Sequence, residues 1–148
     1  MVEVFRARFL FMVGICLFAL VGPSLAKEDL RAQRHQQAVA IVQEYFRLEQ
    51  ARDYERVYGL YSSKIRRDLR GVNVKSGAEY KRLREIQGSK WDKFDITDVN
   101  FDTQLNAIVS VTAEYAQQII GEHVAYGKVD LIVLVVWESE KPLIDSVN

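Results

Sequence analysis

The stretch IVQEYFRLEQARDYERVYGLYSSKIRRDL, residues 41–69, contains the pattern of two amphipathic helices joined at an aspartate. Its first half continues an apolar stripe with spacings of three and four residues, which predicts a helix over residues 28–51. Asp53 is expected to cap the second helix, because an aspartate at a helix start accepts a hydrogen bond from a free backbone N–H group. The apolar stripe of that second helix comprises Tyr54, Val57, Tyr58 and Tyr61.

The end of the same stretch predicts a third helix. It is expected to begin at Ser62 or Ser63, both good capping residues, and to end at Gly71. Ile65 and Leu69 lie one helical turn apart, so both side chains are expected to be buried.

A fourth helix is predicted by the sequence SGAE at residues 76–79, which matches a capping box. The face of this helix that is expected to meet the core comprises Tyr80, Leu83 and Ile86. Gly88 is expected to end it, because glycine readily adopts the left-handed conformation common after a helix.

After Trp91 the apolar residues alternate as in β-strands. Strands are expected over residues 94–101, 105–115, 124–137 and 142–147. The alternation slips near Thr97–Asp98, which predicts a bulge there, and Gly121–His123 is expected to form a turn. Helices followed by antiparallel strands predict a single α+β domain covering residues 27–148.

The first 26 residues have the pattern of a secretory signal peptide. An apolar run of 13 residues, Phe9–Val21, follows two arginines and precedes Pro23 and small residues. A membrane span needs roughly 17–25 residues, so we expect cleavage after Ala26 and a periplasmic or secreted protein. If the segment is retained, it would anchor the protein in the inner membrane.

The third strand contains LIVLVVW, residues 131–137, which is apolar on both faces. Helices can cover only one face of a small sheet, so the other face needs a different cover. One candidate is the same face of a second copy, which would make an isologous homodimer. This face comprises Ile108, Ile132, Leu134 and Val136. The alternative is that the strand is enclosed within its own curved sheet.

The order of elements resembles the nuclear transport factor 2-like superfamily, also called the SnoaL-like or cystatin-like cone. The resemblance rests on residues 41–69 with their DYE opening, the capping box, Trp91, and VVWESEKPLIDSV at residues 135–147. It implies N-terminal helices packed in the concave face of a strongly bent antiparallel sheet, with a pocket at the open end. Leu143 stands where many members have tryptophan. Members include isomerases, dehydratases, binding modules and assembly proteins, so the resemblance specifies fold better than function.

A pocket in such a fold is expected to be lined by aromatic side chains. The candidates are Tyr45, Tyr54, Tyr58, Tyr80, Trp91, Tyr115 and Trp137. Acid–base catalysis in the pocket would need a buried acid, and we assign no acidic residue to a buried position in the helical stripes or strands. Capping accounts for Asp53. No catalytic residue is therefore predicted. His35 and His123 lack the spacing of metal ligands, and no motif indicates a metal site or a cofactor.

Charge is unevenly distributed along the chain. Residues 64–93 contain ten basic and four acidic side chains, whereas residues 94–148 contain two basic and nine acidic ones. The basic cluster Lys64, Arg66, Arg67 and Arg70 is a candidate surface for an anionic partner, and the alternative is a solvated helix face. A nucleic-acid partner is not expected, because the cluster lacks interleaved exposed aromatic residues.

Two functions follow from these features. The first is an exported, non-catalytic domain that binds a small apolar ligand or a partner protein, as a homodimer. The second is a small cofactor-free enzyme for proton transfer or dehydration. A membrane-tethered assembly module of a secretion-type complex is a further alternative if the N-terminal segment is retained.

Overall fold

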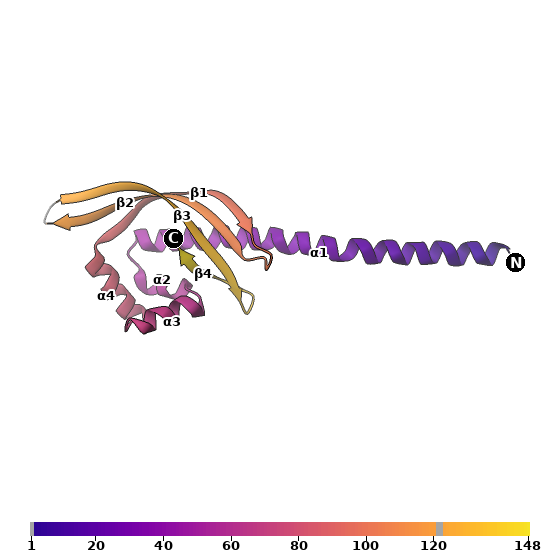
Figure 1. Cartoon of the computed structure of the whole chain (residues 1–148), viewed down its shortest axis with the longest axis horizontal. Coiled ribbons are helices and arrows are strands. Elements are labelled where there is room, and N and C mark those ends of the chain that lie inside the picture. The colour runs from indigo at the N-terminus through magenta and orange to yellow at the C-terminus, as the bar shows by residue number, and fades with distance from the viewer. Residues whose placement is uncertain (1, 121–122) are drawn as a thin grey trace. The chain divides into compact units, whose positions relative to one another are not determined.

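The protein has an α+β fold of four helices and one four-stranded antiparallel sheet in its described residues (Figure 1). The computed structural model describes the backbone of residues 2–120 and 123–148 and the side chains of residues 26–116 and 126–148. The chain divides into two compact units, Met1–Arg34 and His35–Asn148.

Helix α1 extends over Val2–Gln50. The predicted end near residue 51 is confirmed, whereas the predicted start at residue 28 is wrong, because the helix continues through the residues before it. The expected signal sequence lies within this helix, and its side chains up to residue 25 are outside the described part. No described helix is long and apolar enough to cross a membrane.

The predicted caps of the three short helices are confirmed. Helices α2 (Tyr54–Leu60), α3 (Ser63–Gly71) and α4 (Gly77–Gln87) follow in chain order. The side chains of Asp53, Ser62 and Ser76 each accept a hydrogen bond from a backbone N–H group in the first turn of the helix that they cap. Gly88 ends α4 with φ of 66°, a conformation that glycine adopts without strain.

Three expectations about helix burial were wrong. Ile65 and Leu69 are only half-buried on α3, and this helix has no fully buried residue. Ile86 is 84% exposed on α4. The helical spacing of these residues is that of an apolar stripe, but a short helix at the edge of a domain packs on one side only.

The sheet contains the strands β1 (Ser89–Phe101), β2 (Ala107–Ile120), β3 (His123–Glu138) and β4 (Lys141–Val147), in that order. The predicted bulge is confirmed by a register shift between Ile96 and Asp98, and a second shift lies between Trp91 and Lys93. Leu105 was expected in the second strand but precedes it with φ of 61°. The turn expected at Gly121–His123 falls mostly on residues 121–122, outside the described part.

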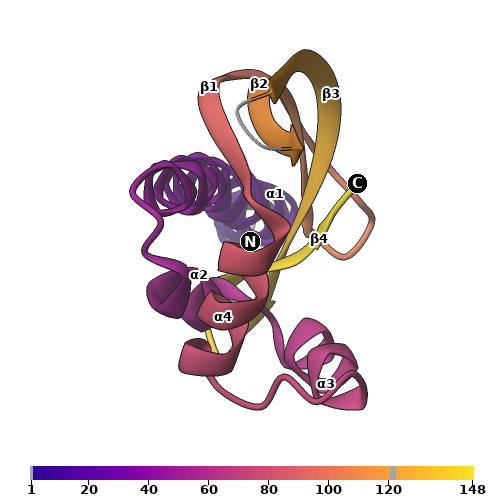
Figure 2. The same cartoon turned by 90° about the vertical axis from the view of Figure 1, so that its left-hand side faces the viewer.

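One face of the sheet carries the core. Alternate residues of β2 and β3 are buried there: Ala107, Val109, Val111, Ala113, Leu131, Val133 and Val135. The last turns of α1 pack on this face, where the Phe46 and Phe94 rings stack at 4.8 Å and Trp137 Nε1 donates to Gln37 Oε1 at 2.8 Å. Figure 2 shows α1, α2 and α4 on the same side of the sheet.

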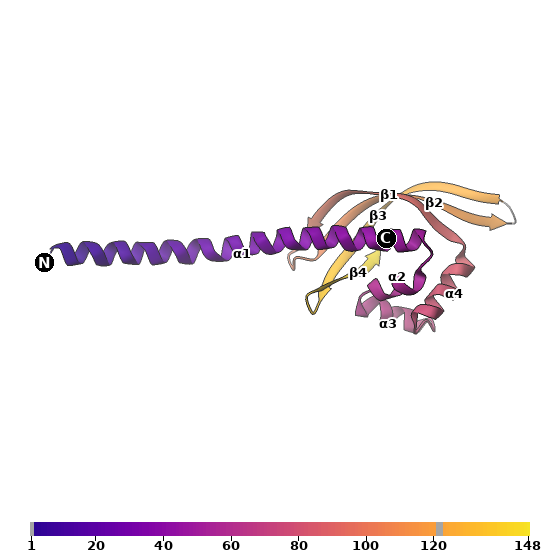
Figure 3. The same cartoon turned by 180° about the vertical axis from the view of Figure 1, so that it is seen from behind.

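Helix α3 is joined to the last strand at its start. Tyr61 and Ile144 form a parallel bridge, and the Ser62 N–H group donates to the Ile144 carbonyl at 2.8 Å. The Ser62 hydroxyl donates to Asp145 Oδ1 at 2.6 Å while it accepts from the Ile65 N–H group at 3.2 Å. Figure 3 shows α3 and β4 near one another at this end of the sheet.

A glycine on β3 makes room for a tyrosine ring on β2. Tyr115 and Gly127 are cross-strand partners, and a Cβ atom at Gly127 would lie 2.6 Å from the Tyr115 Cζ atom. Such a contact is too short, so an alanine here would push the ring away. Gly127 therefore fixes where the Tyr115 ring lies.

We expect Gly127→Ala to lower the free energy of unfolding by about 1 kcal/mol, because the ring must leave its position. Gly59→Ala is the matched control, since a Cβ there meets nothing within 4 Å. It should instead stabilise helix α2 by up to about 1 kcal/mol. Urea unfolding of both variants measures the difference, and an equal gain in stability for both would contradict the proposed contact.

Candidate functional site

A cavity of ≈ 560 Å³ lies where the helices and the sheet of the second unit converge. All four helices or their caps and all four strands contribute to it. Its described lining comprises Tyr45, Tyr61, Ile65, Leu69, Tyr80, Arg84, Ser89, Lys90, Trp91, Tyr115, Val129, Leu131 and Val147. These walls are mostly aromatic and aliphatic. A second hollow of ≈ 650 Å³ lies along α1 and β1, but Asp95, Asp98 and other polar side chains line it.

The structure brings together four of the seven aromatic residues expected at a pocket: Tyr45, Tyr80, Trp91 and Tyr115. The other three lie outside the described lining. Tyr54 is buried, with its ring 5.3 Å from the Arg84 guanidinium carbon, and the Tyr58 ring lies 6.0 Å from that of Tyr80. Trp137 contacts α1 through Gln37.

Three tyrosines form a row in the cavity wall. The hydroxyls of Tyr61 and Tyr80 are 2.7 Å apart, and the Tyr45 ring lies 6.3 Å from the Tyr61 ring. Burial raises the pKa of all three phenols well above the ordinary value of 10.0. They therefore stay protonated at physiological pH and act as hydrogen-bond donors.

A buried ion pair joins Arg84 of this wall to Glu49, and it was missed by the sequence analysis. The Arg84 Nη2 atom donates to Glu49 Oε2 at 2.6 Å, and the Glu49 side chain is only 1% exposed. The expectation that no acidic residue occupies a buried stripe position was therefore wrong. The sequence did indicate that Glu49 is buried. It follows Tyr45 by four residues and Val42 by seven, and this spacing places it on the buried face of α1.

The pair is only partly satisfied by hydrogen bonds. Arg84 Nη1 donates to Gln87 Oε1 at 2.7 Å and to Ser89 Oγ at 3.2 Å. Glu49 Oε1 and Arg84 Nε are buried without a partner among the described residues. Burial raises the pKa of Glu49 above its ordinary value of 4.5, and the charge of Arg84 opposes this shift only in part.

The basic cluster predicted for an anionic partner lies on α3. Lys64 Nζ lies 3.1 Å from Asp145 Oδ2 and its side chain is 60% exposed. Arg66 Nε contacts the Ser62 carbonyl oxygen at 3.5 Å. Arg67 and Arg70 are exposed, and neither forms an ion pair with a described residue.

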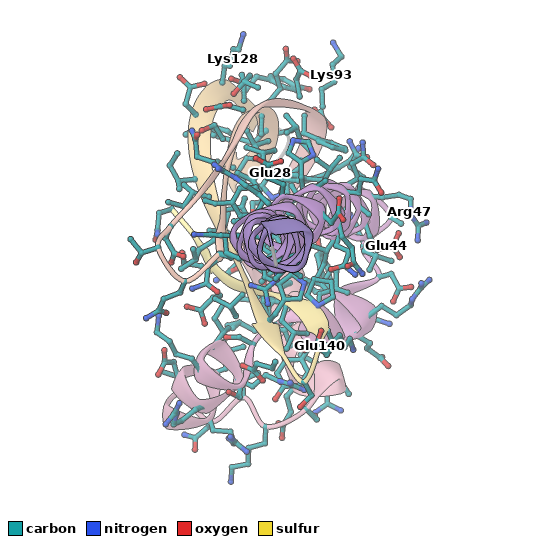
Figure 4. The ribbon with its side chains drawn as sticks, turned by 90° about the vertical axis from the view of Figure 1, so that its right-hand side faces the viewer. Glu28, Glu44, Arg47, Lys93, Lys128 and Glu140 are labelled. Carbon is teal, nitrogen blue, oxygen red and sulfur yellow. The ribbon has the colours of Figure 1, made fainter. Side chains whose placement is uncertain are left out.

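Other candidates for chemistry are scattered. Asp53 caps α2, and its Oδ2 atom lies 3.6 Å from Arg56 Nη1. Arg56 also pairs with Glu44, which lies next to Arg47 on the surface (Figure 4). His35 lies on α1 beside the second hollow, and the His123 side chain is outside the described part. Among the described residues no group of three or more possible ligands could hold a metal ion.

Comparison with models of known protein families finds no match, and no curated protein matches the sequence significantly.

The raised pKa of Glu49 predicts a pH dependence of stability. The folded protein holds the Glu49 proton more tightly than the unfolded chain does, so the stability contribution of this group increases as pH falls through the folded pKa towards 4.5. Glu49→Gln removes the titration. The difference in unfolding free energy, variant minus unchanged protein, should therefore be larger at pH 7 than at pH 5.

Chemical unfolding at the two pH values measures this difference, with Glu44→Gln as control. Glu44 carries no such burial, and the hydrogen bond from Arg47 lowers its pKa. A relative stability of Glu49→Gln that is the same at both pH values would contradict the raised pKa.

Proposed function

We propose that this protein binds a small apolar ligand in the cavity between its helices and its sheet. The observation that carries the proposal is the lining, in which aromatic and aliphatic walls surround a few hydrogen-bonding groups. Ligand pockets of proteins have this composition, and their volumes are commonly about 300–1,000 Å³. The protonated tyrosine row would orient a ligand that carries a hydrogen-bond acceptor.

Binding is favoured over catalysis by the protonation states at the cavity. The raised pKa values of Tyr45, Tyr61 and Tyr80 keep these three phenols protonated, so none of the three can act as a base near neutral pH. Glu49 is the one observation in favour of a proton-transfer enzyme, because it is a buried acid with a free oxygen. It does not belong to the described lining and its other oxygen is held by Arg84. A ligand-bound structure in which Glu49 contacts the ligand would favour catalysis.

We further propose that the domain is a cone-like member of the nuclear transport factor 2-like superfamily. Supporting features are the long first helix, the three short helices and the antiparallel sheet with two register shifts in its first strand. An experimental structure that aligns with members of that superfamily over the whole sheet would test this.

Export remains part of the proposal because of the apolar run and small residues within the first 26 positions. Cleavage after Ala26 would release a periplasmic or secreted domain, and retention would leave it anchored or tethered to a membrane. Intact-mass measurement of the protein from its native host separates the two.

The outer face of the sheet supports a homodimer as the second part of the proposal. Ile132 is 44% exposed there, and Ile108, Leu134 and Val136 are half-buried beside it. Register pairs Ile108 with Leu134 and Val136 with Leu143, so these side chains share one face. These four residues are uncharged, so the same face of a second copy could pack against them and bury both apolar surfaces.

Dye binding tests the cavity. We expect N-phenyl-1-naphthylamine, a neutral dye that fluoresces in apolar surroundings, to bind at one saturable site. Ile65→Trp should abolish this binding, because the larger ring fills part of the cavity that Ile65 lines. Val72→Trp, directly after the same helix, is the matched control, since Val72 is 67% exposed and does not line the cavity. Equal dye binding by both variants would place the dye elsewhere.

Sedimentation equilibrium tests the dimer. We expect the protein to be dimeric and Ile132→Lys to make it monomeric, because a charge would be buried between the two faces without a partner. Ile86→Lys is the control, as Ile86 is an exposed isoleucine on α4. A protein that is monomeric without any substitution would overturn the dimer and leave the ligand proposal standing.

A further inference from the structure

Helix α3 has two chemically different sides. Within its nine residues, SKIRRDLRG, four are basic and one is acidic. The two large apolar residues, Ile65 and Leu69, lie one turn apart and both line the cavity. They are half-buried, so this side of the helix borders the cavity while remaining partly open to solvent.

The rest of the helix presents positive charge. Arg67 and Arg70 are exposed without a described ion-pair partner, and Arg66 is half-buried beside them. Lys64 lies across the helix and shares its charge with Asp145. The three arginines lie within about a third of the helix circumference at about 100° per residue, so they form one basic face.

Exposed apolar surface accompanies this basic face. Val72, which follows α3 directly, is 67% exposed. Charged side chains next to exposed apolar ones are the combination that peripheral proteins use at the interface of an anionic bilayer. A bilayer offers anionic headgroups to the arginines and an apolar region to Val72, whereas an acidic protein segment would match the charges alone.

We propose that the basic face of α3 docks the protein on anionic lipid bilayers. At about 100° per residue this face lies well away from the Ile65 and Leu69 side of the helix, so the docking leaves the cavity side free of the membrane. The docking is independent of the proposed function.

Vesicle co-sedimentation at low salt tests the docking. The unchanged protein should bind vesicles of phosphatidylcholine mixed with phosphatidylglycerol and not vesicles of phosphatidylcholine alone. Each basic residue near an anionic surface strengthens binding about fivefold, so the triple variant Arg66→Gln/Arg67→Gln/Arg70→Gln should bind about a hundredfold more weakly. Added salt should weaken the binding of the unchanged protein, because it screens the attraction.

The matched control removes the same charge elsewhere. Arg47, Lys93 and Lys128 are exposed basic residues away from α3, as Figure 4 shows, and their triple glutamine variant has the same net charge as the α3 variant. It should keep nearly all of its vesicle binding. Equal loss in both variants would overturn a specific role for α3, as would absence of binding to the anionic vesicles. Binding to polyglutamate but not to those vesicles would identify an acidic protein partner and would likewise overturn the proposal.

Dye binding in the absence of vesicles separates this proposal from the proposed function. The α3 variant should bind N-phenyl-1-naphthylamine as the unchanged protein does, which also shows that it is folded. If the single variant Arg70→Gln and the triple variant both keep full vesicle binding, the docking face is wrong while the cavity proposal stands. If no form of the protein binds the dye but vesicle binding depends on α3, the cavity proposal fails and the docking stands.

Discussion

The arrangement of the cavity depends on the buried ion pair between Glu49 and Arg84. Their side chains are 1% and 15% exposed, and their contact at 2.6 Å ties the end of α1 to α4. Arg84 also lies over the Tyr54 ring and donates to Ser89 at the start of β1. One guanidinium thus sets the positions of α1, α2, α4 and β1. A buried pair of this kind adds little net stability, because desolvation offsets the attraction, but separating the two charges is costly. The pair therefore restricts the ways in which the helices can pack.

The tyrosine row follows from that restriction. Tyr45 and Tyr80 lie four residues before Glu49 and Arg84 respectively, so each tyrosine is one helical turn from a partner of the ion pair. Tyr61 comes from the C-terminal end of α2, where its backbone also bridges to Ile144. The three rings contact one another only when α1, α2 and α4 are packed together. The result is a mostly apolar cavity whose polar groups are tyrosine hydroxyls, Ser89 and the cations Arg84 and Lys90, all of which can donate hydrogen bonds. Such a lining suits recognition of a ligand with hydrogen-bond acceptors better than acid–base chemistry.

Much of the fold could be predicted from local patterns. The caps at Asp53, Ser62 and Ser76, the bulge beside Thr97 and the alternation of β2 and β3 each depend on a few neighbouring residues. The candidate site was predicted less completely. Tyr45 and Tyr80 were expected there, but Tyr61, Ile65 and Arg84 were not, and Tyr54 lies in the core instead. Glu49 was overlooked because a charged residue within an apolar stripe is normally assigned to the surface, although its spacing placed it on the buried face.

The sequence by itself determined the order of the helices and strands, the caps of the three short helices and the bulge in β1, because capping, left-handed glycine and side-chain alternation act over a few residues. Only the tertiary structure decided which polar groups are buried and which side chains face the cavity. Glu49 can be buried because Arg84, distant in the chain, neutralises it, and Tyr115 can turn into the cavity because Gly127 on the next strand lacks a side chain. Both outcomes depend on partners that become neighbours only after folding, so no local pattern contains them.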